Sequence, residues 1–140
     1  RRRIDPVTEI ARNIPRPTPE TAPFWDGCRE GRLLIQQCTG CGHRQFYPRL
    51  VCSQCQGRPV WIEASGKATV ESFTIVRQAV SPAYAADVPY VVALLRLAEG
   101  PGMMSNIVQC DPGLLTIGMP VTVVFEPMSA EITLPKFRPA

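Results

Sequence analysis

The chain has 140 residues, 45% of them hydrophobic and 19% charged, and its formal net charge is +3. This length accommodates one domain, or a small metal-binding module attached to a compact barrel. No apolar run reaches about 18 residues, which excludes a membrane-spanning helix, and so mild a basic excess does not indicate a strongly phosphate-binding surface.

Residues 1–20, RRRIDPVTEIARNIPRPTPE, contain four prolines. Prolines at this density block helix and ladder hydrogen bonds alike, so we expect an extended linker or tail here. The chain begins with Arg1 rather than Met, which indicates a piece of a longer protein. Because no apolar stretch follows the first basic residues, we expect no signal peptide and a cytoplasmic location.

Residues 21–60 predict a short helix followed by a metal-binding ribbon. Thr21 before APFWDGCREG is typical of an N-cap, an early proline and an amphipathic helix that ends near Gly31. Phe24 and Trp25 lie on one side of this helix together with Cys28. That apolar side can cover the core of the cysteine module or form part of a partner contact.

Four of the six cysteines form two C-x-x-C pairs, Cys38 with Cys41 and Cys52 with Cys55, separated by ten residues. Two such knuckles facing one another supply four thiolates in a tetrahedron, which suits zinc. With all four positions filled by protein, no coordination site is left for a catalytic water, so we predict one structural zinc. Iron in a rubredoxin-like site is the main alternative, ahead of a disulfide or a redox dithiol.

After the ribbon come five segments rich in β-branched residues, separated by Gly, Pro and Asp turns. They are KATVESFTIVRQAV, YVVALLRLAE, MMSNIVQC, MPVTVVFEPM and EITLPKF. Five short strands of this kind predict a mostly β fold in which a small Greek-key barrel such as an OB-fold follows the helix and ribbon. We place the barrel at residues 61–134 and a C-terminal tail at 135–140.

The sequence shows no catalytic set. His43 is the single histidine, and its place beside Cys41 favours a supporting or exposed role over that of a general base. Cys28 and Cys110 are left outside the metal scheme and are interpreted as small buried apolar residues. The chain also lacks a phosphate-binding loop and a nucleophile elbow. We therefore predict that it catalyses nothing on its own.

The order of these parts resembles a known family. The helix with PFWDG, the CTGCG…C ribbon and the segment PYVVALLRLAEGPGMMSNIVQCDPGLLTIGMPVTVVFE follow one another over about residues 21–126. They are similar to the bacterial and archaeal proteins in which a rubredoxin-like zinc ribbon precedes an OB-fold, found beside thiolases and other acyl-CoA enzymes. The proline-rich start looks like the linker that follows a hydratase domain in actinobacterial steroid side-chain degradation proteins.

The resemblance implies a non-catalytic accessory subunit. Its partner would be a thiolase-like aldolase that cleaves a steroid side-chain CoA thioester in a retro-aldol step, as part of a carbon–carbon lyase complex. The linker would join it to an upstream hydratase, and its contact with acyl-CoA would be indirect. The resemblance also implies that Cys38, Cys41, Cys52 and Cys55 bind zinc.

The partner surface is predicted from the loop between the first two barrel strands, which OB-folds commonly use for binding. This loop, AVSPAYAADVPY, is apolar apart from Asp87 and suits a protein or acyl surface better than a phosphate chain. The contact candidates are Phe24, Trp25, Pro82, Tyr84 and Tyr90. The alternative function is a nucleic-acid-binding zinc-ribbon and OB-fold module, which requires basic strands with exposed aromatic residues. We expect no nucleic acid and no membrane among the partners.

Overall fold

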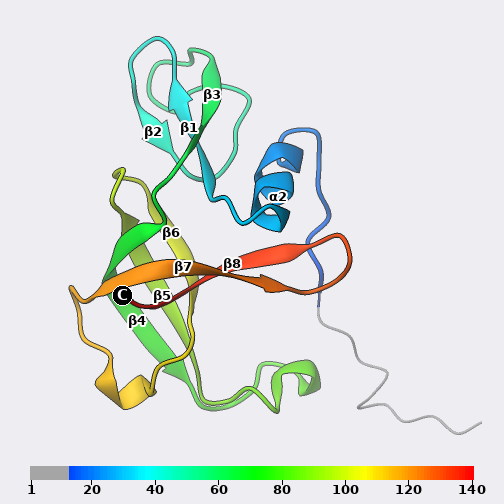
Figure 1. Cartoon of the computed structure of the whole chain (residues 1–140), viewed down its shortest axis with the longest axis vertical. Helices are drawn as coiled ribbons and strands as arrows, with labels where there is room; N and C mark the ends of the chain where they lie inside the picture. The colour runs from blue at the N-terminus through cyan, green and yellow to red at the C-terminus, as the bar shows by residue number, and fades with distance from the viewer. Residues whose placement is uncertain (1–12) are drawn as a thin grey trace, which may run out of the picture.

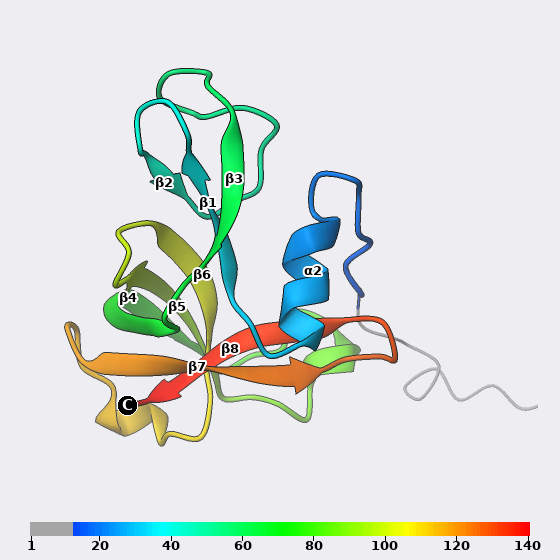
Figure 2. The ribbon, with the colours of Figure 1, turned by 45° about the horizontal axis from the view of Figure 1, so that its top comes forward.

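The computed structural model describes residues 13–140 and shows a small three-stranded module above a five-stranded barrel, with one helix at their side (Figures 1 and 2). The first part contains α2 (Ala22–Arg29), β1 (Leu34–Cys38), β2 (Arg44–Gln45) and β3 (Pro59–Glu63). The barrel contains β4 (Lys67–Val76), β5 (Tyr90–Leu97), β6 (Gly102–Ile107), β7 (Pro120–Pro127) and β8 (Thr133–Pro139). Two 3₁₀ turns, η1 (Pro82–Tyr84) and η2 (Pro112–Leu114), lie in its loops.

The barrel closes in the order β4-β5-β6-β8-β7, and only the β6–β8 pair is parallel. Its strands form because apolar side chains recur at every second position, which turns one face of each strand inward. In β5, the side chains of Val91, Ala93, Leu95 and Leu97 are buried, while those between them are more exposed. The predicted mostly β fold with one short helix and a five-stranded barrel is therefore confirmed.

β4 pairs with β5 along one edge and with β7 along the other, and its register with β5 shifts between Val70 and Ser72. Such a bulge bends a strand and increases its twist. Glu71 lies at the bulge, and its two carboxylate oxygens accept hydrogen bonds from Nε and Nη2 of Arg96 at 3.0 and 3.1 Å. The bend helps to close the barrel.

One core runs through the helix, the ribbon and the barrel. Phe24 of α2 packs on Phe46 of the ribbon with ring centroids 5.4 Å apart, and both belong to the same buried cluster as Leu95 and Phe137 of the barrel. Phe137 is fully buried. The two modules therefore pack as one body through shared apolar contacts, which sets the direction in which the ribbon projects.

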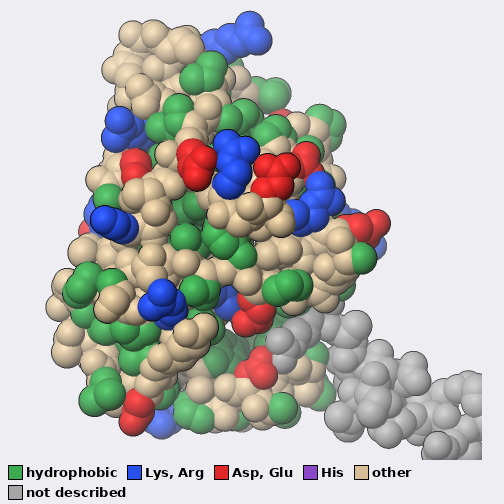
Figure 3. Space-filling model, in the orientation of Figure 1, with side chains coloured by type: hydrophobic (Ala, Val, Ile, Leu, Met, Phe, Trp, Pro, Cys, Tyr) green, Lys and Arg blue, Asp and Glu red, His purple; other side chains and the backbone are tan. Residues whose placement is uncertain are grey.

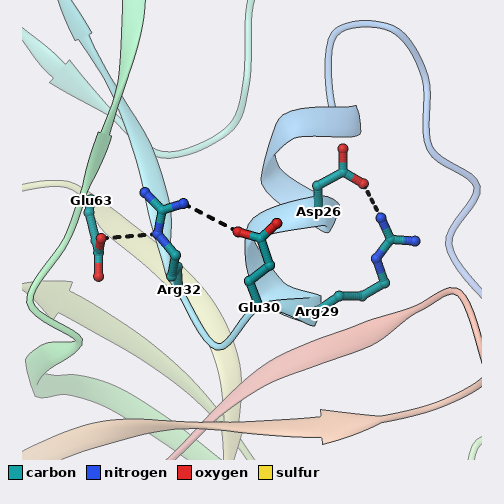
Figure 4. Close-up of polar contacts among 5 residues, drawn as sticks. All are labelled: Asp26, Arg29, Glu30, Arg32 and Glu63. Carbon is teal, nitrogen blue, oxygen red and sulfur yellow. Dashed lines mark hydrogen bonds and ion pairs between the residues drawn. The ribbon is translucent and has the colours of Figure 1, made fainter.

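Several ion pairs lie on the face of the molecule that carries α2 (Figure 4). The guanidinium of Arg32 lies 3.1 Å from the carboxylate of Glu63 in β3 and 3.3 Å from that of Glu30, which follows α2. Arg29 pairs with Asp26, which lies one turn earlier on the helix. Figure 3 shows these charges as a row of alternating sign. Because the side chains are about half exposed, each pair contributes little to stability, about 0–1 kcal/mol.

Strands extend past two of the predicted boundaries. β8 continues to Pro139 and pairs with β7 up to Val121, so residues 135–139 are barrel strand and not a tail. β3 stays in the ribbon sheet as far as Glu63, past the boundary predicted at residue 60, because it pairs with β1 up to Leu34. Of the predicted linker, residues 1–12 lie outside the described part, and 13–17 form neither helix nor strand.

The predicted N-cap is also adjusted. Thr21 directly precedes the helix but makes no side-chain capping bond. Instead the backbone N–H of Thr21 donates to Oγ1 of Thr18 at 3.3 Å, and that of Ala22 donates to the Thr18 carbonyl at 2.8 Å. The turn that leads into the helix therefore begins at Thr18, three residues before Thr21. No helix among the described residues is long and apolar enough to cross a membrane.

Gly66, at the junction of ribbon and barrel, offers a test of this geometry. It has φ +84°, and a Cβ there would lie 2.6 Å from Cγ1 of Val123. We expect Gly66→Ala to lose about 1–2 kcal/mol for the left-handed backbone and about 1–3 kcal/mol more for overpacking. The matched control is Gly118→Ala, since Gly118 has φ +88° but open space around it. Chemical denaturation of both variants should show the larger loss for Gly66→Ala, and equal losses would contradict the close packing.

Candidate metal centre and partner surfaces

The four cysteines of the two C-x-x-C pairs converge at the outer end of the ribbon. Cys38 ends β1, Cys41 lies in the turn that follows, and Cys52 and Cys55 lie in a second turn before β3. Their sulfur atoms all lie within 4.8 Å of one another. The Sγ atoms of Cys38 and Cys55 are 3.5 Å apart, and those of Cys41 and Cys52 are 3.7 Å apart.

These distances fit a tetrahedral metal. A zinc–sulfur bond of about 2.3 Å places neighbouring sulfurs of a regular tetrahedron about 3.8 Å apart. The donor set is four thiols, which suits zinc, and iron can also be held by four thiolates. The geometry therefore fits a closed four-sulfur site, as the sequence predicts.

Backbone N–H groups support the sulfurs as thiolates. The N–H groups of Cys41 and Gly40 lie 3.5 and 3.2 Å from Sγ of Cys38, and that of Gln54 donates to Sγ of Cys52 at 3.3 Å. The bonds from Cys41 and Gly40 lower the pKa of the Cys38 thiol to about 6. At Cys55 a bond from the Gly57 N–H lowers the pKa, but the neighbouring Cys38 and Cys41 thiols outweigh it and raise the pKa to about 12. Donors directed at a sulfur favour its charged form, which is the form that binds metal.

Glycine is required after the second knuckle for a reason that the sequence analysis did not give. A Cβ on Gly57 would lie 2.9 Å from Sγ of Cys38 and 3.1 Å from Sγ of Cys55. The left-handed position of this knuckle is Gln56, with φ 63°, whereas in the first knuckle it is Gly42, with φ 78°. Gly57 is therefore needed for close approach of the backbone to the sulfurs.

Two buried glutamines hold the loop between the knuckles. Gln36 of β1 and Gln45 of β2 face each other in the sheet, and Nε2 of Gln45 donates to Oε1 of Gln36 at 2.8 Å. Gln36 also accepts from the N–H of Arg49 at 2.9 Å and donates to the Arg49 carbonyl at 3.0 Å. Gln45 accepts from the N–H of Ser53 at 3.0 Å and reaches the Val51 carbonyl at 3.4 Å.

This amide pair accounts for the shape of the ten-residue spacer between the two C-x-x-C pairs. Within the spacer only Arg44 and Gln45 form strand, and residues 46–51 are irregular. The side chains of Gln36 and Gln45 take the place of ladder hydrogen bonds for this loop. The sequence does not predict this role, because glutamines on a short strand look solvent-exposed until the pairing of β1 with β2 is known.

Of the predicted contact residues, Phe24 belongs to the core, with only 5% of its surface exposed. Its ring stacks edge-on between those of Trp25 and Phe46, so the core role that we weighed for it is the one found. Trp25 is partly buried against the core. Phe24 therefore offers a partner little surface of its own, but it also lines a hollow of about 370 Å³ beside β6, so its contact role stays a prediction.

Tyr84 and Tyr90 come together beside the barrel, with ring centroids 6.3 Å apart. They line a hollow of about 480 Å³ between the β4–β5 loop and β6. Lys136 lies in the same hollow and donates to Glu126 at 2.7 Å. Pro82 begins η1 in the same loop but does not line the hollow. The predicted loop thus brings its two tyrosines together beside an ion pair.

The remaining candidates for chemistry serve the structure. Cys28 is buried in the core, as predicted, and burial raises the pKa of its thiol to about 12, so it is not a nucleophile at neutral pH. Cys110 is only half-buried, so its predicted burial is partial, and its thiol donates to the Asp111 carbonyl at 3.3 Å. His43 accepts a hydrogen bond from the N–H of Cys38 through its backbone carbonyl at 2.8 Å.

Comparison with known proteins matches both modules. Residues 25–60 match the rubredoxin-like zinc ribbon domain of ChsH2, and residues 61–126 match the C-terminal OB-fold domain of ChsH2. The chain belongs to the ChsH2 family. The closed barrel described above is thus its OB-fold, and the four-cysteine module is its zinc ribbon.

Two hydratase subunits are similar to this chain. A probable enoyl-CoA hydratase alpha subunit of Thermomonospora curvata is 38% identical over 120 residues, which cover 84% of this chain and 37% of that protein. The 3-oxo-4,17-pregnadiene-20-carboxyl-CoA hydratase alpha subunit of Mycobacterium tuberculosis is 34% identical over 107 residues, or 76% of this chain and 33% of that one. The chain therefore spans about a third of the length of these relatives.

Two shorter proteins match along most of their length. A DUF35 domain-containing scaffold protein of Methanothermobacter thermautotrophicus is 33% identical over 71% of this chain and 75% of its own. A chain of the solved Ltp2-ChsH2(DUF35) aldolase is 33% identical, with a TM-score of 0.81, over 90% of this chain and 98% of that one. The fold thus recurs almost whole in a protein solved as part of an aldolase.

The cysteine cluster predicts one tightly bound zinc per chain. Cys52→Ser should lose the metal and the structure of the ribbon, because metal binding supplies much of the folding free energy of such small modules. The matched control is Cys110→Ser, which leaves the four sulfurs intact. Elemental analysis and thermal unfolding with and without a chelator measure both effects. A native protein without metal, or with iron, would contradict the assignment of zinc.

The amide pair predicts a difference between neighbouring glutamines on β1. Gln36→Leu leaves the N–H and carbonyl of Arg49 without their partners and should lower the free energy of unfolding by about 1–3 kcal/mol. Gln37→Leu is the control, because Gln37 only accepts a bond from Nε of the exposed Arg44. Hydrogen exchange at the Arg49 amide should accelerate in the first variant and stay unchanged in the second. Equal exchange in both would show that the loop does not depend on Gln36.

Proposed function

We propose that this chain is a non-catalytic accessory domain that binds and supports a thiolase-like aldolase acting on an acyl-CoA. The observation that carries the proposal is the likeness to a chain of the Ltp2-ChsH2(DUF35) aldolase over 98% of that chain at 33% identity. The name of the Methanothermobacter relative, a scaffold protein, supports the same role. At this identity and coverage, the surfaces as well as the fold can be shared.

The distribution of reactive groups supports a role without catalysis. Among the described residues, the thiols of the four-cysteine cluster face one another and Cys28 is buried. The single histidine stands beside that cluster. Thiols that face one another or lie in the core are poorly placed to act as nucleophiles. This supports the proposal that the reacting groups belong to the partner.

The substrate we propose is a steroid side-chain β-hydroxyacyl-CoA thioester. A retro-aldol step breaks its Cα–Cβ bond: the hydroxyl loses its proton and becomes a carbonyl, while the electron pair remains on Cα, which is then protonated. Support comes from the pregnadiene-carboxyl-CoA named for the Mycobacterium relative. A hydratase can supply the hydroxyl by adding water to an enoyl-CoA, which explains why the two activities would be joined.

The described part of the linker supports attachment to an upstream hydratase. Residues 13–17 lie beside α2 and the β7–β8 turn, where Trp25, Asp26, Arg29 and Ile132 line a hollow of about 630 Å³ with them. Residues 13–17 thus lie on one side of the helix. We propose that this side faces the hydratase.

Zinc is the metal we propose for the cysteine site, with a structural role. The four sulfurs fill the coordination shell that the geometry allows, so the metal would hold the two knuckles together and leave no site for substrate. Phe24, Trp25, Pro82, Tyr84 and Tyr90 remain proposed contacts to a partner or its ligand. The tyrosine pair and its hollow support this for Tyr84 and Tyr90.

The test is co-expression with a thiolase-like aldolase from the same organism. We expect the two to co-purify as a stable complex, and we expect retro-aldol cleavage of the CoA thioester only when both are present. The control is the Cys52→Ser variant, which should fail to support activity because its ribbon is lost. An aldolase that works at full rate without this chain would overturn the accessory role.

A further inference from the structure

An exposed apolar surface lies where the ribbon meets the barrel. Met104 of β6 and Leu94 of β5 stand opposite each other on the outside of the barrel and are 56% and 46% exposed. Tyr47 of the ribbon loop is 56% exposed, and Leu50 in the same loop is 73% exposed. We call Tyr47, Leu94 and Met104 the junction surface; Leu50 lies in the loop that carries Tyr47. Large apolar side chains gathered on a surface mark interaction sites.

A hollow of about 370 Å³ opens beside this surface. Its walls are mostly apolar and come from four parts of the fold: Trp25 from α2, Tyr47 from the ribbon, Met103 and Met104 from β6, and Leu134 from β8. The rings of Trp25, Phe24, Phe46 and Tyr47 follow one another at centroid distances of 4.9, 5.4 and 4.7 Å. This aromatic series leads from the core to the open side of the hollow.

The loop that carries Tyr47 and Leu50 is held in place before any partner arrives. The side chains of Gln36 and Gln45 bond to the backbone of Arg49, Val51 and Ser53 from inside the ribbon. Such a loop loses little conformational freedom on binding, which favours affinity. Two buried glutamines fix the shape of this irregular loop, and the loop presents apolar side chains to water. Such a loop is suited to docking.

The charge around the surface indicates the kind of partner. Residues 33–62, which include the whole ribbon sheet except Glu63, contain Arg44, Arg49 and Arg58 and no Asp or Glu. At the outer end of the ribbon, Figure 3 shows basic and no acidic side chains. Arg49 lies next to Leu50 in the loop, and its side chain is exposed. A complementary partner therefore offers an apolar projection with acidic side chains near it.

We propose that the junction surface is where the aldolase subunit docks, with an apolar side chain or turn of that subunit in the hollow and its Asp or Glu residues facing Arg49. This proposal rests on the proposed function. A nucleic acid fits the surface less well, because strand binding needs several exposed aromatic rings in a basic groove. The junction surface offers one such ring, Tyr47, beside a leucine and a methionine.

The experiment compares apolar residues at two ends of the barrel. Met104→Asp and Leu94→Asp place a charge in the junction surface. Leu114→Asp and Ile117→Asp are matched controls, because these side chains are 70% and 63% exposed and lie in the η2 loop, at the end of the barrel away from the ribbon (Figure 1). All four positions are exposed, so the variants should fold, which circular dichroism and zinc content verify.

Affinity for the purified aldolase subunit is measured by titration calorimetry with the full chain. We expect Met104→Asp and Leu94→Asp each to weaken binding at least about tenfold, as for residues central to an interface, and the controls to stay within about twofold. Arg49→Glu should lower the association rate and reduce its dependence on salt. Unchanged binding by Met104→Asp and Leu94→Asp would overturn the junction surface and leave the accessory role standing.

Two other outcomes are distinguishable. If the wild-type chain shows no binding to the aldolase, both the accessory role and the docking surface fail. If a fluorescent single-stranded oligonucleotide binds the wild-type chain, and Arg49→Glu or added salt abolishes that binding, the surface recognises phosphate. That result would overturn protein docking in favour of the nucleic-acid module.

Discussion

The convergence of four sulfurs within 4.8 Å is the constraint on which the ribbon depends. The three strands of this module are short, and β2 has only two residues. A sheet of this size buries too little apolar surface to fold alone, and a metal commonly supplies the missing free energy. By joining Cys38 and Cys41 to Cys52 and Cys55, the site closes the loop between the knuckles and gives the glutamine pair a fixed loop to hold.

The ribbon is also tied to the barrel by a shared core. Phe24 and Phe46 continue the buried cluster that includes Leu95 and Phe137, so helix, ribbon and barrel pack against one another. This explains how an accessory protein can present a surface made from several elements. The hollow beside Met104 exists only because α2, the ribbon loop and β6 are held in fixed relation.

Most of the thiols and the two buried glutamines contribute to the structure of the chain. Four thiols face a common centre, a fifth is buried with its pKa raised to about 12, and the glutamines bond to backbone. These groups hold the fold in shape. The likeness to a chain of an aldolase and to a scaffold protein is the support for the accessory role that we propose.

The sequence by itself determined the four-cysteine cluster and the barrel strands, because both follow from the spacing of residues along the chain. The spacing of Cys38, Cys41, Cys52 and Cys55 predicts a four-sulfur site, and the alternation of apolar residues in segments such as YVVALLRL predicts strands. Family resemblance added the kind of partner. These features depend on residues close together in the sequence, so they can be predicted without knowing the tertiary contacts.

Tertiary structure alone decided which surfaces face outward. Phe24 is core because Phe46 packs on it, residues 135–139 are strand because β7 pairs with them, and the spacer is a loop because Gln36 and Gln45 hold it. Each outcome depends on contacts between segments distant in sequence, which leave no periodic pattern. The junction surface arises in the same way, since Tyr47 and Met104 meet only in the folded protein.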